Sequence, residues 1–193
     1  MAYLSYTKDM QGVADVFLRD ADLYAPLLQF IEGVMTRPSD LTKAEREMIA
    51  AHVSSRNGCD FCVGAHRWTL AAMKVDWQTI DALQHGPDSE DLPSRLRVML
   101  RYAEKLTDAP GQMNQNDSAA LTAAGWSEQA IEDAINVVAL FNYVNRLVDA
   151  LGIENDDTYF RRVGQALATS GYKPLLERAR QLNLFIQAKG RRT

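Results

Sequence analysis

The 193-residue chain has little cysteine and histidine, two residues of the first and three of the second. Two cysteines are too few for a disulfide-stapled scaffold, so a hydrophobic core has to stabilise the fold. The longest apolar run, around residues 137–144, is interrupted by Asn142 and is far too short to span a membrane. The first residues lack the basic start and apolar stretch of a signal peptide. We therefore expect a cytoplasmic protein with no membrane partner, and in a reducing compartment a close cysteine pair is typical of redox, catalytic or metal-binding sites.

An excess of basic charge is absent as well. The 25 Asp and Glu residues outnumber the 21 Lys and Arg, which gives a formal net charge of −4. A short basic tail at residues 189–193 is typical of a solvated chain end. Because general nucleic-acid binding requires a clustered positive surface, we expect no nucleic-acid partner. The composition is that of an ordinary globular protein, and the length suits a single domain over residues 1–193, with its cysteine motif in about 40–75.

Alternating strand patterns and hairpin signals are missing, and helical patterns fill the chain. Apolar residues at three- and four-residue spacing predict the helices. Thr42 and Glu45 form a candidate capping box, and Asp76, Asp117 and Ser127 are candidate caps of later helices. The sequence therefore predicts an all-α fold. The longer helices are expected over residues 23–35, about 42–56, 59–73, 93–106, 127–151, 156–169 and 174–187.

The two cysteines form a C-x-x-C motif, Cys59 and Cys62, and His66 follows four residues after the second cysteine. At about 100° per helical residue, all three share one face within a strip about 60° wide. Two thiols at this spacing near a helix start can form a disulfide with little rearrangement. An imidazole one turn beyond Cys62 can take its proton directly or through one water. Glu47 lies on the preceding helix, and the intervening turn can fold that helix back so that its carboxylate approaches His66.

Spacing alone does not decide which cysteine is the nucleophile. The helix dipole favours a thiolate at Cys59, the more N-terminal of the two, whereas the neighbouring Asp60 carboxylate raises the cost of that charge. Cys62 has a base within reach, because His66 can collect its proton and then stabilise the thiolate as an imidazolium. On these grounds we favour Cys62 as the nucleophile and Cys59 as the resolving thiol.

The run formed by Glu47, Cys59, Cys62 and His66 resembles the signature of the alkylhydroperoxidase D (AhpD)-like branch of the carboxymuconolactone decarboxylase family. Residues 141–152, FNYVNRLVDALG, are similar to a second marker, that of the family's peroxidase-related subgroup. The decarboxylase side of the family generally lacks the cysteine pair, so its activity is a poor match to this sequence. The resemblance implies an all-α fold, homo-oligomerisation and thiol peroxidase chemistry.

The resemblance also implies a role for each residue: Cys62 as the peroxidatic thiol, Cys59 as the resolving thiol, and Glu47 with His66 as the proton relay. Such a cycle reduces a hydroperoxide and leaves a disulfide, which an external dithiol on a lipoyl-bearing or thioredoxin-like partner must reduce. It requires no bound cofactor or metal. At one position the sequence departs from the best-studied alkylhydroperoxidase members, since Phe61 replaces the histidine that they carry immediately before the second cysteine.

The same residues admit other interpretations. Two cysteines on an amphipathic helix can simply be small buried hydrophobes. Cys59, Cys62 and His66 also supply three zinc-type ligands, with Glu47 or His52 as a fourth, although structural zinc sites usually close with paired knuckles. The alternatives to a peroxidase are therefore another dithiol oxidoreductase, or a helical module that binds a metal or a partner with this face.

A polar stripe follows the longest predicted helix, where Asn142, Asn145, Arg146 and Asp149 are spaced at i, i+3, i+4 and i+7. It is either a solvated face with an Arg146–Asp149 ion pair, or a polar seam at a subunit contact or at the rim of the site. Other scarce side chains are expected to have structural roles in the core, at an interface or at a helix end: His52, His85, Trp68, Trp77 and Trp126.

Overall fold

The computed structural model describes the backbone of residues 3–190 and the side chains of residues 3–184. Within that range the regular secondary structure is helical and contains no strand, which confirms the predicted all-α class. The basic tail predicted at 189–193 lies outside the described side chains. The α-helices are α1 (Val13–Arg19), α2 (Ala21–Thr36), α3 (Lys43–Arg56), α4 (Asp60–Ala72), α5 (Trp77–His85), α6 (Ser94–Asp108), α7 (Gln115–Ala123), α8 (Glu128–Leu151), α9 (Asp157–Ser170) and α10 (Lys173–Gly190).

Local capping signals set several helix starts. The predicted capping box opens α3: the Thr42 hydroxyl accepts the backbone N–H of Glu45 at 3.2 Å, and the Glu45 carboxylate accepts that of Thr42 at 2.8 Å. Ser127 caps α8 as predicted. The prediction that Asp117 caps α7 is wrong, because Asn114 occupies that position. Asp117 lies one turn inside, where its carboxylate accepts the Asn114 backbone N–H at 2.8 Å, so the helix begins earlier than the acidic residue suggested.

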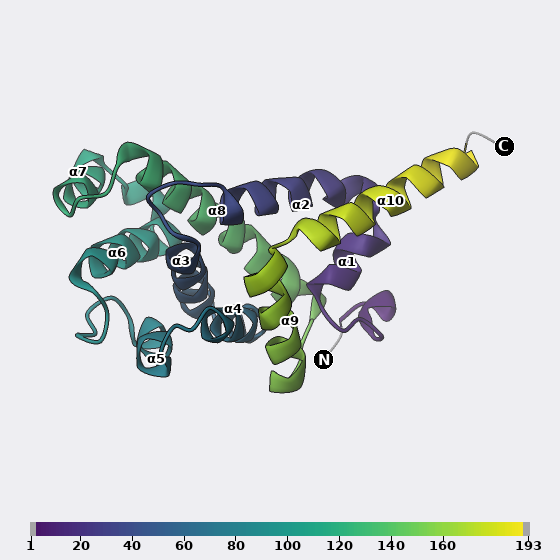
Figure 1. Ribbon diagram of the computed structural model, residues 1–193, viewed down its shortest axis with the longest axis horizontal. Coiled ribbons are helices and arrows are strands. Elements are labelled where there is room, and N and C mark those ends of the chain that lie inside the picture. The colour runs from purple at the N-terminus through teal and green to yellow at the C-terminus, as the bar shows by residue number, and fades with distance from the viewer. Residues whose placement is uncertain (1–2, 191–193) are drawn as a thin grey trace.

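The helices are arranged around a core that α3 and α8 share. α3 packs against α8, α6 and α4, while α8 is buried along most of its length. Figure 1 shows α5, α6 and α7 at one end of the molecule and α1, α2 and α10 at the other, with α10 alongside α2. α4 lies between these ends and makes its most extensive contact with α9. The helix that carries the cysteine motif therefore packs mainly between α3 and α9, which are far apart in the sequence.

The turn between α3 and α4 leads directly into the C-x-x-C motif, and side chains of α8 are hydrogen bonded to this turn. Gly58 has φ = 71°, in the left-handed region that favours glycine. Asn145 of α8 is fully buried against this turn. Its side chain accepts a hydrogen bond from Nδ2 of Asn57 at 2.8 Å and donates one to Oγ of Ser54 at 3.0 Å. Within the polar stripe of α8, Asn145 and the half-buried Asn142 thus form a seam inside the chain beside the C-x-x-C motif. Arg146 and Asp149 are exposed, and Arg146 donates to Asn142.

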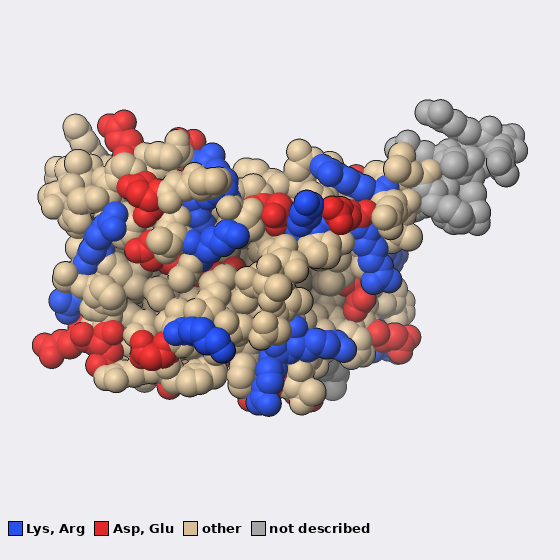
Figure 2. All heavy atoms as spheres, viewed as in Figure 1, with Lys and Arg blue, Asp and Glu red and all other residues tan. Residues whose placement is uncertain are grey.

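The face shown in Figure 2 carries both signs of charge interspersed among uncharged residues. Such a mixture produces no extended positive field on that face, in keeping with the composition. Among the helices within the described residues, none combines the length and the apolar character required to cross a membrane.

Candidate active site

Glu47 on α3 and His66 on α4 meet in the interior of the molecule. Nδ1 of His66 lies 2.6 Å from Oε2 of Glu47, and the two side chains are 4% and 5% exposed. A carboxylate at this distance from Nδ1 fixes the orientation of the imidazole ring. The ring of Phe141 packs edge-on against the imidazole, with centroids 4.4 Å apart. The predicted approach of Glu47 to His66 is therefore observed, although their roles in a reaction remain predictions.

Cys59 and Cys62 are free, buried thiols at the start of α4. Cys59 is the residue that caps the helix, and Cys62 is in its first turn, so the helix start acts on both positions. A hydrogen bond with Cys62 raises the pKa of the Cys59 thiol, and burial and a hydrogen bond to the Asp149 carboxylate raise it further. Cys59 therefore keeps its proton at pH values where an ordinary cysteine ionises. Asp149 belongs to the polar stripe of α8, and its contact with a cysteine could not be predicted from helical spacing.

A narrow pocket of about 120 Å³ opens beside Cys62 and His66. Its walls come from α1, α2, α4, α8, α9 and α10 and consist mainly of aliphatic and aromatic side chains. Among the residues that line it, those with polar side-chain groups are Cys62, His66, Tyr159 and Tyr172. Cys59 does not line this pocket, so Cys62 is the thiol that a ligand there would meet. The arrangement combines a thiol, an imidazole with its carboxylate partner, and a mainly apolar pocket.

Comparison with known proteins identifies the family of this chain. The model of the carboxymuconolactone decarboxylase family matches residues 21–105. A solved structure, an uncharacterized peroxidase-related protein from Silicibacter sp. TM1040, is 30% identical, with a TM-score of 0.72 over 77% of this chain and 78% of that chain. The chain belongs to the AhpD-like branch of the carboxymuconolactone decarboxylase family. An uncharacterized peroxidase-related protein from Ralstonia eutropha JMP134, described as an alkylhydroperoxidase AhpD core, is 28% identical, with a TM-score of 0.71 over 78% of both chains.

Two further proteins are more distantly similar to this AhpD-like protein, and one of them has a solved structure. A protein of unknown function from Agrobacterium tumefaciens, described as a putative antioxidant defence protein AhpD, has a TM-score of 0.60 at 17% identity, over 81% of this chain and 99% of that chain. The uncharacterized protein YdfG of Bacillus subtilis is 24% identical over 117 residues, which is 61% of this chain and 80% of that protein. The AhpD-like fold predicted from the sequence is confirmed.

The AhpD-like protein uses its remaining histidines away from the cysteines. His52 is buried, with Nδ1 2.9 Å from the carbonyl oxygen of Leu83 and Nε2 3.6 Å from a carboxylate oxygen of Glu104. Burial lowers its pKa, so the ring is neutral in this position. His85 is the exposed last residue of α5. His52 therefore does not join Cys59, Cys62 and His66 as a fourth ligand, and residues 3–184 contain no group of three or more His, Cys, Asp or Glu arranged to hold a metal ion.

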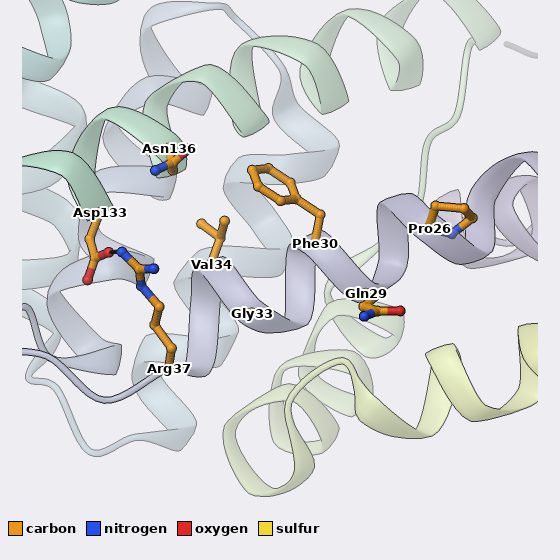
Figure 3. Close-up of a pocket in the computed structure, with 8 residues that line it drawn as sticks. All are labelled: Pro26, Gln29, Phe30, Gly33, Val34, Arg37, Asp133 and Asn136. Carbon is orange, nitrogen blue, oxygen red and sulfur yellow. Dashed lines mark hydrogen bonds and ion pairs between the residues drawn. The ribbon is translucent and has the colours of Figure 1, made fainter.

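A second, wider pocket of about 540 Å³ lies between α2 and α8. Figure 3 shows Phe30 and Val34 of α2 pointing toward α8, while Arg37 reaches across to Asp133. Asp133 also receives the guanidinium of Arg46, which is fully buried, at 2.5 Å. The residues that line this pocket include no cysteine or histidine, whereas the narrow pocket has Cys62 and His66 in its wall.

Proposed function

We propose that this protein is a thiol-dependent peroxidase that reduces hydroperoxides through a dithiol–disulfide cycle of Cys59 and Cys62. The observation that carries the proposal is the shared site: Cys62 lines an apolar pocket together with His66, and His66 is hydrogen bonded to the buried carboxylate of Glu47. A buried carboxylate–imidazole pair beside a thiol is the arrangement that activates a cysteine nucleophile. The family membership supports the same assignment.

In the first half of the cycle His66 takes the proton of Cys62, and Glu47 stabilises the imidazolium that forms. The Cys62 thiolate attacks the terminal oxygen of the hydroperoxide. The S–O bond forms as the O–O bond breaks, which gives a sulfenic acid on Cys62 and an alkoxide or hydroxide. His66 returns its proton to that leaving oxygen, so an alcohol or water departs and the relay is reset.

In the second half the Cys59 thiol condenses with the sulfenic acid, and the disulfide and one water form. Cys59 is suited to this role because its raised pKa keeps it from competing for the peroxide, which reacts with the thiolate form. Asp149, which accepts a hydrogen bond from the Cys59 thiol, relays the thiol proton to the departing hydroxide as the S–S bond forms and the S–O bond breaks, so that one water leaves. An external dithiol, carried by a lipoyl- or thioredoxin-like partner, then exchanges with the disulfide and restores both thiols. We further propose that the whole chain acts as one domain, as a homo-oligomer and in the cytoplasm.

Separate cysteine variants test the cycle. Wild-type protein is expected to consume hydroperoxide with dithiothreitol as reductant and, without reductant, to form the Cys59–Cys62 disulfide, detected by mass spectrometry. Cys62→Ser is expected to consume no peroxide. Cys59→Ser is expected to stop at a sulfenic acid that a dimedone probe labels on Cys62. A wild-type rate of peroxide consumption no greater than that of Cys62→Ser would overturn the proposal. If the Cys59–Cys62 disulfide formed by exchange with an added disulfide substrate but not with peroxide, the protein would instead be a non-peroxidase dithiol oxidoreductase.

A further inference from the structure

Tyr172 brings a hydroxyl group to the pocket from well beyond the segment that matches the family model, residues 21–105. It lies in the turn between α9 and α10, where its backbone N–H donates a hydrogen bond of 2.7 Å to Oε2 of Glu32 on α2. Its carbonyl oxygen accepts the N–H of Leu176 in the first turn of α10. Both backbone groups are therefore engaged, and they fix the backbone of a residue that lines the same pocket as Cys62 and His66.

Among the described residues no hydrogen bond engages the hydroxyl itself, and the residue as a whole is half-buried. Burial raises the pKa of Tyr172 well above its usual value, and the negative charges of Glu47, Cys62 and Glu32 raise it further. The group therefore stays a neutral donor throughout the pH range in which a thiolate forms. A protonated, unpaired hydroxyl in an otherwise apolar pocket has its proton free for a ligand.

The proposed reaction requires a donor at this position. When the thiolate attacks, negative charge develops on the leaving oxygen of the peroxide, and hydroxide is a very basic leaving group because water is a very weak acid. The pocket wall beside Cys62 includes Phe61, Phe141 and Val144, which donate no hydrogen bond. A fixed donor aimed at developing charge in a site without water is worth far more than the same group in solution.

We propose, on the basis of the peroxidase function proposed above, that Tyr172 is a catalytic residue that donates a hydrogen bond to the leaving oxygen of the hydroperoxide. As the S–O bond forms and the O–O bond breaks, the electron pair of the O–O bond passes to that oxygen. Tyr172 stabilises the charge there until the proton that His66 took from Cys62 neutralises it. The net balance of the step is one thiol and one hydroperoxide giving one sulfenic acid and one alcohol or water.

Tyr172→Phe removes this hydroxyl and leaves the ring in place. The rate constant for oxidation of Cys62 is measured by rapid mixing with two oxidants whose leaving groups differ in basicity. Hydrogen peroxide expels basic hydroxide, whereas peracetic acid expels a carboxylate, whose conjugate acid has a pKa of only about 4. The variant is expected to lose about 100-fold in rate with hydrogen peroxide, the scale of one lost donor to a developing oxyanion, and less than about 3-fold with peracetic acid.

Tyr102→Phe is the matched control, since Tyr102 is a buried tyrosine on α6 that does not line the pocket. It is expected to react with both oxidants at wild-type rates, and urea unfolding of both variants checks that each is folded. Equal losses with the two oxidants in Tyr172→Phe would mean that Tyr172 only shapes the pocket and would overturn the inference, as would no loss with either. A wild-type protein that reacts with neither oxidant would overturn the proposed function itself, which is a distinguishable result.

Discussion

His66 and Glu47, 19 residues apart in sequence, share a 2.6 Å hydrogen bond in a place that solvent barely reaches. Burying a carboxylate is costly unless it is paired and hydrogen bonded, so this contact is retained against a considerable desolvation penalty. The same protein contains a second histidine–carboxylate pair, His52 with Glu104, in which the atoms are 3.6 Å apart and the carboxylate is 28% exposed. The first pair faces a thiol and the second does not, so the two allow a controlled comparison.

Glu47→Gln is expected to slow the oxidation of Cys62 by about 100-fold, because the amide no longer stabilises the imidazolium that accepts the thiol proton. Glu104→Gln makes the same change beside His52 and is expected to leave the rate unchanged. Rates are measured with hydrogen peroxide at a fixed pH near 7.5. A Glu47→Gln protein that reacts as fast as wild type would show that the pair is structural.

The stability of the reduced protein is expected to fall with rising pH because of Cys59. Its pKa in the folded state is raised above the ordinary value of 9.0, so above pH 9 the unfolded chain loses a proton that the folded chain retains. The unfolded state is then favoured, by about 1.4 kcal/mol per pH unit at most. Between pH 8 and pH 10, wild-type protein should therefore lose about 1.4 kcal/mol of unfolding free energy relative to Cys59→Ser, which cannot titrate at that position. Urea unfolding with a reductant present measures this difference, and parallel pH profiles for the two proteins would contradict it.

The sequence predicted the part of the site that is local in the chain. Glu47 and His66 lie on consecutive helices joined by a short turn, so helical spacing and the Asn57-Gly58 stop were sufficient to bring them together. Tyr172 and Asp149 could not be found this way. Their positions depend on how α10 packs along α2 and how α8 packs against α3, and neither packing has a periodic signal in the sequence.

The helix boundaries show the same limit. Helices with a side-chain cap and a glycine stop, such as α3 and α8, were predicted close to their observed ends. The seven-residue helix α1 was not predicted, because it is too short for a periodic apolar pattern and has Gly12 at its cap. It is nevertheless part of the pocket wall, since Val13 and Phe17 line it.

Substitution of Asp133 is expected to lower the unfolding free energy more than substitution of an exposed carboxylate, because Asp133 is the buried counter-charge of Arg46. Asp133→Asn leaves that guanidinium without a charged partner in the interior and should cost about 3 kcal/mol of unfolding free energy. The control is Asp88→Asn, whose ion pair with Arg101 is exposed and should contribute about 0–1 kcal/mol. Urea unfolding compares them, and similar small losses in both variants would show that the backbone contacts of Arg46 alone hold it.

Gly164 is the closest approach of α9 to the helix that carries Cys62 and His66. A Cβ atom at this position would lie 2.4 Å from the backbone carbonyl carbon of Trp68 and 2.6 Å from the backbone nitrogen of Thr69. Backbone cannot move aside as a flexible side chain can, so Gly164→Ala must push α9 away from α4.

We expect Gly164→Ala to lower the unfolding free energy by about 1–3 kcal/mol, the usual cost of overpacking, and to slow the oxidation of Cys62 because Tyr159 and Val163 of α9 line its pocket. Gly33→Ala is the matched control in a helix, since a Cβ there meets nothing within 4 Å. It should stabilise the protein by about 0.5–1 kcal/mol, through helix propensity alone, at an unchanged oxidation rate. Urea unfolding and rapid-mixing kinetics measure both quantities. If Gly164→Ala were stabilised like Gly33→Ala, the close α4–α9 contact would not be a constraint on the pocket.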